Sequence, residues 1–433
     1  MLLRKKKIFF ICFIMIMTMN FIVFAEENIL SIYAGNGSFG YKDGNKTDAE
    51  FRFPYGLDMD NEGNIYVADS YNNLIRKIQG NHVITMAGTY DLKDNFGFPM
   101  GGLVDGSALE ARFNKPRGVA LDSKGNLFIA DTENHVIRKL SGGKVYTFAG
   151  TGQAGYKDGQ AASAQFYKPT GIVLDSEDNI YVSDTFNHVI RKISTDGSVT
   201  TYAGKKSDIG GMKNGTASAA LFNEPSGIAV GQENVLYVFD SGNQLVRKIK
   251  DGQVITVAGS SAVISPETNY AEGGYKNGKN LDARFNFPKG IDVTDNGTIL
   301  IADTWNNRVR AITPEGKVIT IAGGTLTDNN KGKLNGPVAV HYAAEFVYIS
   351  SMWDNNILRI PFNPENPKGI TEFDPVSDHI QVWVDGVKVF FPDMEPYIEN
   401  GKTMVPLRFI CEEWRAEVNW LQEGGKVQVK KGD

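Results

Sequence analysis

"KPTGIVLDSEDNIYVSDTFNHVIRKISTDGSVTTYAG", residues 168–204, decides the fold. It contains four short runs rich in β-branched and aromatic residues, separated by Asp, Asn and Gly: "GIVLD", "NIYVSD", "VIRKI" and "VTTYAG". Runs of this length bounded by such residues predict four antiparallel strands joined by tight turns. A single four-stranded sheet cannot bury both of its faces, so the unit needs similar neighbours on either side.

The unit recurs along the chain, and each copy begins at a proline. These prolines are Pro54, Pro116, Pro169, Pro225, Pro288 and Pro337. The sixth copy stops after its third strand, whereas "ILSIYAG" at 29–35 matches the fourth strand of the other copies. A period of about 50 to 60 residues with four strands per repeat predicts an all-β, six-bladed β-propeller. We expect the N-terminal strand to complete the last blade and close the ring.

The repeats resemble NHL repeats. The resemblance rests on segments such as "NIYVADSYNNLIRKI" (64–78) and "NLFIADTENHVIRKL" (126–140), and on the Pro-x-Gly that opens five of the six copies. It covers about residues 28–362 and implies a β-propeller. Proteins of this family mostly bind proteins, RNA or other ligands, and a minority are lyases. Fold is therefore the safer inference from the resemblance, and function has to be argued from sites.

The C-terminal part is predicted to be a separate small module. A proline-containing linker spans 363–379, after a propeller domain at 26–362, and the module occupies 380–433. Two hairpins, at 382–389 and 416–432, and a helix at 404–414 give a small α+β unit. The stretch at 398–420 resembles the copper amine oxidase N-terminal-like domain of bacterial surface proteins, and the chain ends early for that family. Residues 380–433 contain no His, so copper ligation is not expected.

The first 25 residues predict a signal peptide. A basic start, "MLLRKKK", precedes an apolar run that ends at Val23-Phe24-Ala25. We therefore expect a secreted or cell-surface protein, with an uncleaved membrane anchor as the alternative. Cleavage would move the net charge from −5 to −9, which argues against a nucleic-acid partner. Only Cys411 would remain, so no intramolecular disulfide is expected.

Positions that recur in five copies are interpreted as structural. They comprise an Asp at the end of the second strand (Asp69, Asp131, Asp184, Asp240, Asp303), an Asn three residues later (Asn72, Asn134, Asn187, Asn243, Asn306) and an Arg seven residues later (Arg76, Arg138, Arg191, Arg247, Arg310). The Asp is expected to bond turn amides, the Asn to adopt a positive φ, and the Arg to reach the Asp across the hairpin. The pentapeptide "GYKDG" (40–44, 155–159) has Asp or Asn at its fourth place in every copy, which predicts an Asx turn.

Residues that vary between copies are the binding candidates. The residue two after each Asp is aromatic at Tyr71, Phe186 and Trp305, and Trp353 occupies nearly the same place in the sixth copy. These side chains are expected to project from one propeller face, where they would stack on sugars or anchor a peptide. Scattered, partly packed surface aromatics are the alternative interpretation.

The same face is expected to carry further variable features. His135 and His188 follow the turn Asn in two copies and are included as binding candidates, although unpaired turn histidines are more often ordinary surface residues. Two loops, 89–101 and 260–272, are longer than their counterparts, and enlarged loops are favoured for partner contact.

A channel site is the third candidate. Asp58, Asp292 and His341 stand four residues after the blade prolines of copies one, five and six, which ring closure makes neighbours. A His with two carboxylates fits Zn or Ca, whereas polar residues that wet a central channel are the commoner case. No other cofactor is predicted.

Three functions follow from these patterns. The leading one is an exported, non-enzymatic binding scaffold whose loop face engages a protein or carbohydrate of the cell envelope. The alternatives are a metal-dependent lyase or hydrolase with its site in the channel, and a structural spacer of a cell-surface array. No nucleic-acid partner is expected, and a membrane partner only if the N-terminal segment is uncleaved.

Overall fold

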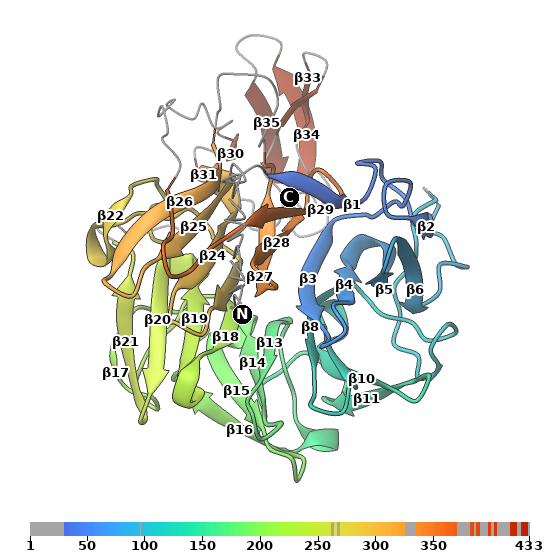
Figure 1. Cartoon of the computed structure of the whole chain (residues 1–433), viewed down its shortest axis with the longest axis horizontal. Helices are drawn as coiled ribbons and strands as arrows, with labels where there is room; N and C mark the ends of the chain where they lie inside the picture. Colours follow the sequence, from blue (N-terminus) through green and yellow to red (C-terminus); the bar gives the residue numbers. More distant parts are fainter. Residues whose placement is uncertain are drawn as a thin grey trace, which may run out of the picture.

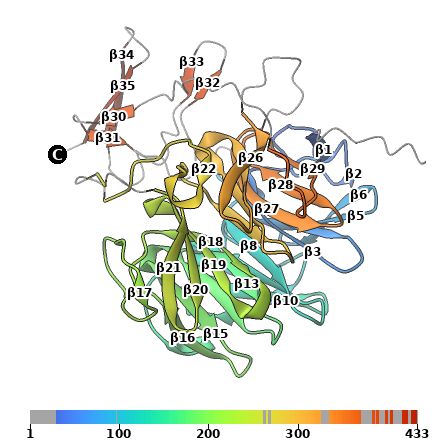
Figure 2. The ribbon, with the colours of Figure 1, turned by 60° about the vertical axis from the view of Figure 1, so that its left-hand side comes forward.

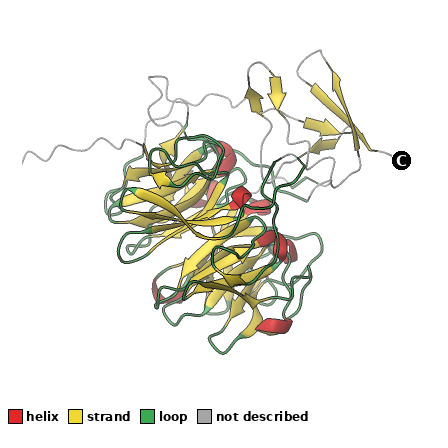
Figure 3. Cartoon of the chain, turned by 90° about the vertical axis from the view of Figure 1, so that its right-hand side faces the viewer, coloured by secondary structure: helices red, strands yellow, loops and turns green. Residues whose placement is uncertain are grey.

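The computed structural model describes residues 30–369, apart from 96, 261–263, 266–268 and 325–333, and six strands between 382 and 431. The predicted signal peptide (1–25) and nearly all of the predicted helix at 404–414 lie outside the described residues. Within the described part, no helix is long and apolar enough to cross a membrane. Helices in this part are single short turns among many strands (Figure 3).

Six sheets are arranged around a common axis as the blades of a propeller (Figure 1). Blade 1 comprises β2 (Gly44–Asn45), β3 (Pro54–Met59), β4 (Ile65–Asp69), β5 (Leu74–Gln79) and β6 (His82–Ala87). Blade 2 comprises β7 (Gly106–Ser107), β8 (Pro116–Leu121), β9 (Leu127–Asp131), β10 (Val136–Ser141) and β11 (Lys144–Ala149). Blade 3 comprises β12 (Gly159–Gln160), β13 (Pro169–Leu174), β14 (Ile180–Asp184), β15 (Val189–Ile193) and β16 (Ser198–Ala203).

The other three blades follow the same order. Blade 4 comprises β17 (Gly215–Thr216), β18 (Pro225–Val230), β19 (Leu236–Asp240), β20 (Leu245–Lys250) and β21 (Gln253–Ala258). Blade 5 comprises β22 (Gly278–Lys279), β23 (Gly290–Val293), β24 (Ile299–Asp303), β25 (Arg308–Ile312) and β26 (Lys317–Gly323). Blade 6 comprises β27 (Pro337–Ala343), β28 (Phe346–Ser351), β29 (Asn356–Pro361) and β1 (Ser31–Ala34). The predicted six-bladed propeller is confirmed.

Ring closure occurs as the repeat pattern predicts. Strand β1, from the start of the described chain, pairs antiparallel with β29, so that Ser31 lies opposite Arg359. The first strands of the blades contact one another in the ring order β3, β8, β13, β18, β23, β27 and back to β3 (Figures 1 and 2). Because the last blade is built from both ends of this domain, the ring is held by main-chain hydrogen bonds.

Five blades have a fifth strand that the sequence pattern does not predict. In blade 1, Gly44–Asn45 pairs with the outer strand, Gly44 opposite Val83. The preceding Asp43 forms no Asx turn. Its carboxylate instead accepts hydrogen bonds from Arg76 at 2.5 Å and from the backbone N–H of Thr85 at 2.9 Å. The pentapeptide therefore attaches the outer edge of a blade to the buried arginine of the third strand.

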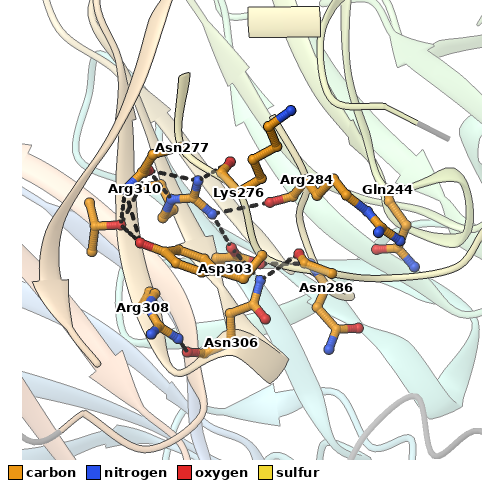
Figure 4. A network of polar contacts seen from close by, with 12 residues as sticks. Gln244, Lys276, Asn277, Arg284, Asn286, Asp303, Asn306, Arg308 and Arg310 are labelled. Atoms are coloured by element: carbon orange, nitrogen blue, oxygen red, sulfur yellow. Dashed lines mark hydrogen bonds and ion pairs between the residues drawn. The ribbon is translucent and has the colours of Figure 1, made fainter. Parts of the chain in front are cut away.

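This arginine is the polar centre of each of blades 1 to 5. Figure 4 shows the case of Arg310, which contacts Asp303, Asn277 and the backbone oxygens of Lys276 and Arg284. All five arginine side chains are fully buried, and each lies 2.6–2.8 Å from the recurrent Asp, as predicted for the hairpin. Each guanidinium also lies 5.0–5.2 Å from a phenylalanine ring. At the positions of the recurrent Asp and Arg, blade 6 has Ser351 and Leu358. Both the carboxylate and the guanidinium are therefore replaced in this blade.

A short helix joins the second and third strands of blades 1 to 5: η1 (Ser70–Asn72), η2 (Thr132–Asn134), η4 (Thr185–Asn187), η6 (Ser241–Asn243) and η8 (Thr304–Asn306). The prediction that the recurrent Asn adopts a positive φ is wrong. That Asn is helical and donates to the recurrent Asp, for example Asn187 to Asp184 at 2.8 Å. The left-handed residue is the next one, such as His188 with φ 57°. Three further short helices are η3 (Ala161–Ser163), η5 (Gln232–Asn234) and η7 (Asn280–Asp282).

The C-terminal strands form three hairpins. They are β30 (Val382–Val384) with β31 (Val387–Val389), β32 (Tyr397–Glu399) with β33 (Lys402–Met404), and β34 (Ala416–Leu421) with β35 (Lys426–Lys431). The first and third hairpins are those predicted from the sequence, and the second is additional.

Candidate functional site: the turn face and the axial channel

On the face that carries the strand 2 to strand 3 turns, here called the turn face, a hydrogen bond of one recurring kind joins each pair of neighbouring blades. In all six blades the residue after the turn is left-handed, with φ of 52–58°, and its side chain accepts from a backbone N–H of the next blade. The pairs are Asn73 Oδ1 with Lys115 (2.8 Å), His135 Nδ1 with Lys168 (3.1 Å), His188 Nδ1 with Glu224 (3.0 Å), Gln244 Oε1 with Phe287 (2.7 Å), Asn307 Oδ1 with Gly336 (2.7 Å) and Asn355 Oδ1 with Phe53 (3.2 Å).

The two histidines therefore have a structural task. An imidazole nitrogen that accepts a hydrogen bond is unprotonated, so both rings must be neutral. Burial lowers the pKa of His188 to about 4, and burial also lowers the pKa of His135. Asn and Gln perform the same task in the other blades, which argues against a ligand-binding role for either histidine.

The four predicted aromatic residues pack inward against the segment before their blade proline. Trp305 does not project: it is 7% exposed and lies against Phe287, with ring centroids 4.6 Å apart. Phe186 packs on Tyr167 in the same manner, at 5.3 Å. Tyr71 and Trp353 belong to a single cluster at the junction of blades 6 and 1, centred on Phe53, Val338 and Met352. The structure thus brings two of the four together and leaves the others in separate blades.

The indole nitrogens of Trp305 and Trp353 are both buried. Within the described part of the chain, neither Trp305 Nε1 nor Trp353 Nε1 has a hydrogen-bond acceptor. A buried donor without an acceptor is costly. Trp305 is buried as a packing element of the turn face, whereas Trp353 is half-buried.

The enlarged loop 89–101 presents apolar side chains to solvent on this face. Backbone bonds from Met100 N–H to the Leu92 oxygen and from Asp94 N–H to the Phe98 oxygen shape it into a hairpin-like excursion. Asn73 Nδ2 donates to its Pro99 oxygen at 3.1 Å. The loop patch is defined by six side chains that are 38–48% exposed: Tyr90, Leu92, Phe98, Met100, Leu103 and Val104. Exposed apolar side chains of this kind on and beside an enlarged surface loop make it a candidate interaction surface.

The second enlarged loop, 260–272, is described at 260, 264–265 and 269–272. Its end is fastened to the turn of blade 4, where Ala271 N–H donates to Gly242 and Asn223 Nδ2 donates to Asn269. Both enlarged loops therefore share the turn face, as predicted.

The turn-face end of the axial channel contains a cavity of about 80 Å³. One Gly in each of blades 1 to 5 lets the inner strands approach closely: a Cβ on Gly171 would lie 2.1 Å from the Ser226 oxygen. The side chains before these glycines line the cavity, and they are Tyr55, Arg117, Thr170, Ser226, Lys289 and, in blade 6, Val338. The volume suits a few waters or one small chemical group, far below the roughly 300 Å³ of a typical ligand pocket.

The other end of the channel holds the predicted metal candidates. His341 Nδ1 lies 3.6 Å from Asp292 Oδ2, and Asp58 is close enough to interact electrostatically with both. Burial raises the pKa of Asp58 and of Asp292. Each carboxylate also accepts a backbone N–H from the next blade's inner strand, Leu121 for Asp58 and Tyr342 for Asp292, both at 2.7 Å.

These bonds give the carboxylates a structural role between blades. Among the described residues, no group of three His, Cys, Asp or Glu side chains has an arrangement that would hold a metal ion. The three candidates therefore converge, and the two carboxylates are held in interblade hydrogen bonds.

Comparison with family models identifies the repeats. The NHL repeat model matches residues 51–78 and 113–140, and the teneurin NHL domain model matches 213–313. The chain contains NHL repeats. Residues 383–433 match the model of the copper amine oxidase N-terminal domain, as the sequence predicts.

Several known proteins are similar to this NHL-repeat chain. NHL repeat-containing protein 2 of Homo sapiens is 27% identical over 62% of this chain and 40% of its own length. Protein SUPPRESSOR OF QUENCHING 1, chloroplastic, of Arabidopsis thaliana is 28% identical over 54% of this chain and 23% of its own length. The chain thus spans less than half of these relatives.

Similar folds also occur among solved structures. An auxiliary nutrient binding protein from Bacteroides thetaiotaomicron is 14% identical, with a TM-score of 0.56 over 77% of this chain and 76% of that chain. At this identity the likeness shows the propeller fold alone.

Sequence reasoning missed two features of the turn face. The first is the interblade acceptor, whose signal was a residue after the turn that is always Asn, Gln or His. The second is that Arg117 and Lys289 line the axial cavity. The sequence indicated this only through the variable middle residue of Pro-x-Gly.

Proposed function

We propose that this chain is an exported, non-enzymatic binding scaffold whose turn face engages a protein of the cell envelope. The observation that carries the proposal is the loop patch on 89–104. Four of its six members, Leu92, Met100, Leu103 and Val104, are aliphatic. Aliphatic surface favours a protein partner over a glycan, because sugars are held mainly by aromatic stacking and polar groups.

Three further points support binding over chemistry and export over residence in the cytoplasm. The channel cavity of about 80 Å³ is too small for most substrates. The first 25 residues have the composition of a signal peptide. One protein of similar fold is described as an auxiliary nutrient binding protein, a title that names a binding role.

Retention on an envelope fraction of the source cells tests the proposal. The double variant Leu92→Ser with Met100→Ser should lose most retention, because truncating a hot-spot side chain at the centre of an interface costs about 2 kcal/mol or more. Leu281→Ser is the matched control, since Leu281 is 56% exposed on the outer edge of blade 5. Equal retention of wild type and the double variant would contradict the proposal, and no retention of either would favour the structural spacer.

The second candidate function is a metal-dependent lyase or hydrolase. The observation that favours it is the convergence of Asp58, Asp292 and His341 at one end of the channel, where the three side chains would have to rearrange to bind a metal ion. It requires stoichiometric Zn or Ca in the purified protein, and elemental analysis measures this directly. Metal that persists in the His341→Ala variant would count against these residues as ligands.

A further inference from the structure

A second cavity lies between blades 5 and 6, on the face opposite the turn face. Its volume is about 470 Å³, and it is lined by β27, by the strand 1 to strand 2 turns of both blades and by residues 361–365. The two blades are neighbours in the ring, since β24 contacts β27 (Figure 1). Ligand sites usually measure about 300 to 1,000 Å³, so this cavity has the size of a ligand site and the axial cavity does not.

The segment that follows β29 forms one wall of the cavity. Phe362 is buried in the core shared by blades 5 and 6, and its backbone N–H donates to the Glu345 oxygen at 2.8 Å. Two residues later, the Pro364 oxygen accepts a hydrogen bond from Asn296 Nδ2 of blade 5, also at 2.8 Å. The segment therefore crosses from blade 6 to blade 5 and is fixed on both sides, so the wall belongs to the propeller itself.

Two aromatic rings give the cavity an apolar lining. Tyr342 and Phe362 meet edge to face, with ring centroids 6.0 Å apart. Tyr342 is half-buried against the core, and Pro361 and Pro364 add further apolar surface to the lining. The face of an aromatic ring carries partial negative charge and attracts cations. This lining therefore suits a ligand that combines an apolar chain with a positive charge.

The charged groups around the cavity are all acidic. The described residues that line it include no Lys, Arg or His, and they include three exposed carboxylates: Asp295, Glu345 and Glu365. Burial raises the pKa of the Tyr342 hydroxyl, and the negative charges of these three carboxylates raise it further, so all three lie within electrostatic reach of it. Within the part of the chain that the structure describes, none of the three forms a salt bridge.

These features together favour one class of ligand. An anion would be repelled by the three carboxylates. A bare metal ion would use neither the aromatic rings nor the volume, and the described residues contain no group of three His, Cys, Asp or Glu side chains arranged to hold one. An organic cation uses the rings, the volume and the charge at once.

We propose that this cavity binds an organic cation, an alkylammonium or guanidinium group carried on an apolar chain. The chain contacts Tyr342, Phe362 and the two prolines, and the charged group lies among the carboxylates. Free amines contain such a group, and so do the lysine and arginine side chains of a polypeptide. The site lies on the opposite face from the loop patch, so it does not depend on the proposed contact at the turn face.

Isothermal titration calorimetry with 1,5-diaminopentane tests the site in the full chain. At constant ionic strength, wild type should bind the diamine saturably, and 1-pentanol, which has the chain without the charge, should bind about tenfold more weakly. Nα-acetyl-L-lysine amide is the second probe. Saturable binding of either amine supports the site: tighter binding of the lysine derivative indicates a polypeptide side chain as the ligand, and tighter binding of the diamine indicates a free amine.

Charge removal has a matched control on the same face. Asp295→Asn with Glu345→Gln keeps the shape of the cavity and should raise the Kd of the diamine about three- to tenfold. Both positions are exposed, so the variant should fold. The control, Glu62→Gln with Glu177→Gln, removes two exposed carboxylates from the corresponding turns of blades 1 and 3. It should leave the Kd within about twofold of wild type, because these charges are distant and screened.

The aromatic contribution is tested at one position. Tyr342→Leu should raise the Kd about threefold, because leucine keeps apolar surface and loses the ring, whereas Tyr342→Phe should bind as wild type does. Three results would overturn the proposal: no saturable binding of either amine by wild type, equal binding of 1-pentanol and the diamine, or the same Kd for wild type and Asp295→Asn with Glu345→Gln. The Leu92→Ser with Met100→Ser variant should bind the diamine normally, so failure of envelope retention leaves this site unaffected.

Discussion

His188 in blade 3 accepts a hydrogen bond at Nδ1 from the backbone N–H of Glu224 in blade 4, over 3.0 Å. The bond requires a neutral imidazole, and burial lowers the pKa of His188 to about 4 from an unfolded value near 6.5. Between these two pH values the unfolded chain binds the proton and the folded chain does not. Folding stability is therefore complete above pH 6.5 and falls as the pH drops toward 4.

Acid sensitivity of the propeller is the first prediction. Lowering the pH from 7 to 4 should cost on the order of 3 kcal/mol through His188 alone. His188→Gln should reduce this loss, because Gln244 fills the same role in blade 4. Urea unfolding at several pH values measures the effect, and His82→Gln, at an exposed position, is the control. Identical pH profiles for wild type and His188→Gln would show that the imidazole is not the sensor.

Close packing around the axis gives the second prediction. Gly171→Ala should destabilise the protein by about 2 kcal/mol or more, because the new Cβ would meet backbone of the next blade at 2.1 Å and neither strand can move freely. Gly102→Ala is the control, since its Cβ would meet only the flexible Arg112 side chain at 3.3 Å. Thermal unfolding compares the two. A smaller effect at Gly171 than at Gly102 would mean that the inner strands are less tightly packed than the structure shows.

The repeat pattern predicted the fold because it concerns many residues at once. Six prolines at similar spacing, with four short strands predicted after most of them, leave few other arrangements. The N-terminal strand was predicted to complete blade 6 because the sixth copy has only three strands of its own. Single side chains were harder to predict. Trp305 stands in a surface turn by sequence, yet it is buried, because its direction depends on Phe287 from a segment before the strand.

Long-range partners explain the other failures. The pentapeptide acid Asp43 was interpreted from its immediate neighbours, whereas its partner Arg76 lies 33 residues later. The same limit applies to Arg117 and Lys289. They line one cavity from opposite blades, and only closure of the ring brings them to it. Local sequence predicts which residues form turns and strands, and it does not predict which side chains meet.

The buried arginine network gives the third prediction, with two substitutions of opposite outcome. Asp158→Asn should change stability by less than about 1 kcal/mol, because Asn214 and Asn277 hold the corresponding arginine in blades 4 and 5. Asp184→Ala should cost about 3 to 5 kcal/mol, because it leaves the fully buried Arg191 without the carboxylate 2.8 Å away. Chemical denaturation of both variants measures the difference. A costly Asp158→Asn would mean that charge at this position matters.

Closure of the ring gives the fourth prediction, at two adjacent residues of β1. Tyr33 packs edge-on against Tyr348 at 5.1 Å and lies beneath Arg359, whereas Ile32, on the other face of the strand, is 60% exposed. Tyr33→Ala should therefore lower the free energy of unfolding by about 2 kcal/mol, and Ile32→Ala should change it by less than about 0.5 kcal/mol.

Hydrogen exchange separates a loosened seam from a general loss of stability. In Tyr33→Ala, amides of β29 should exchange faster than those of β15, which lies in blade 3 on the far side of the ring. Proteolysis should likewise cut first near residues 30–35. Uniform acceleration of exchange over all blades would show instead that β1 is no more than an ordinary edge strand, and that the ring does not depend on it for closure.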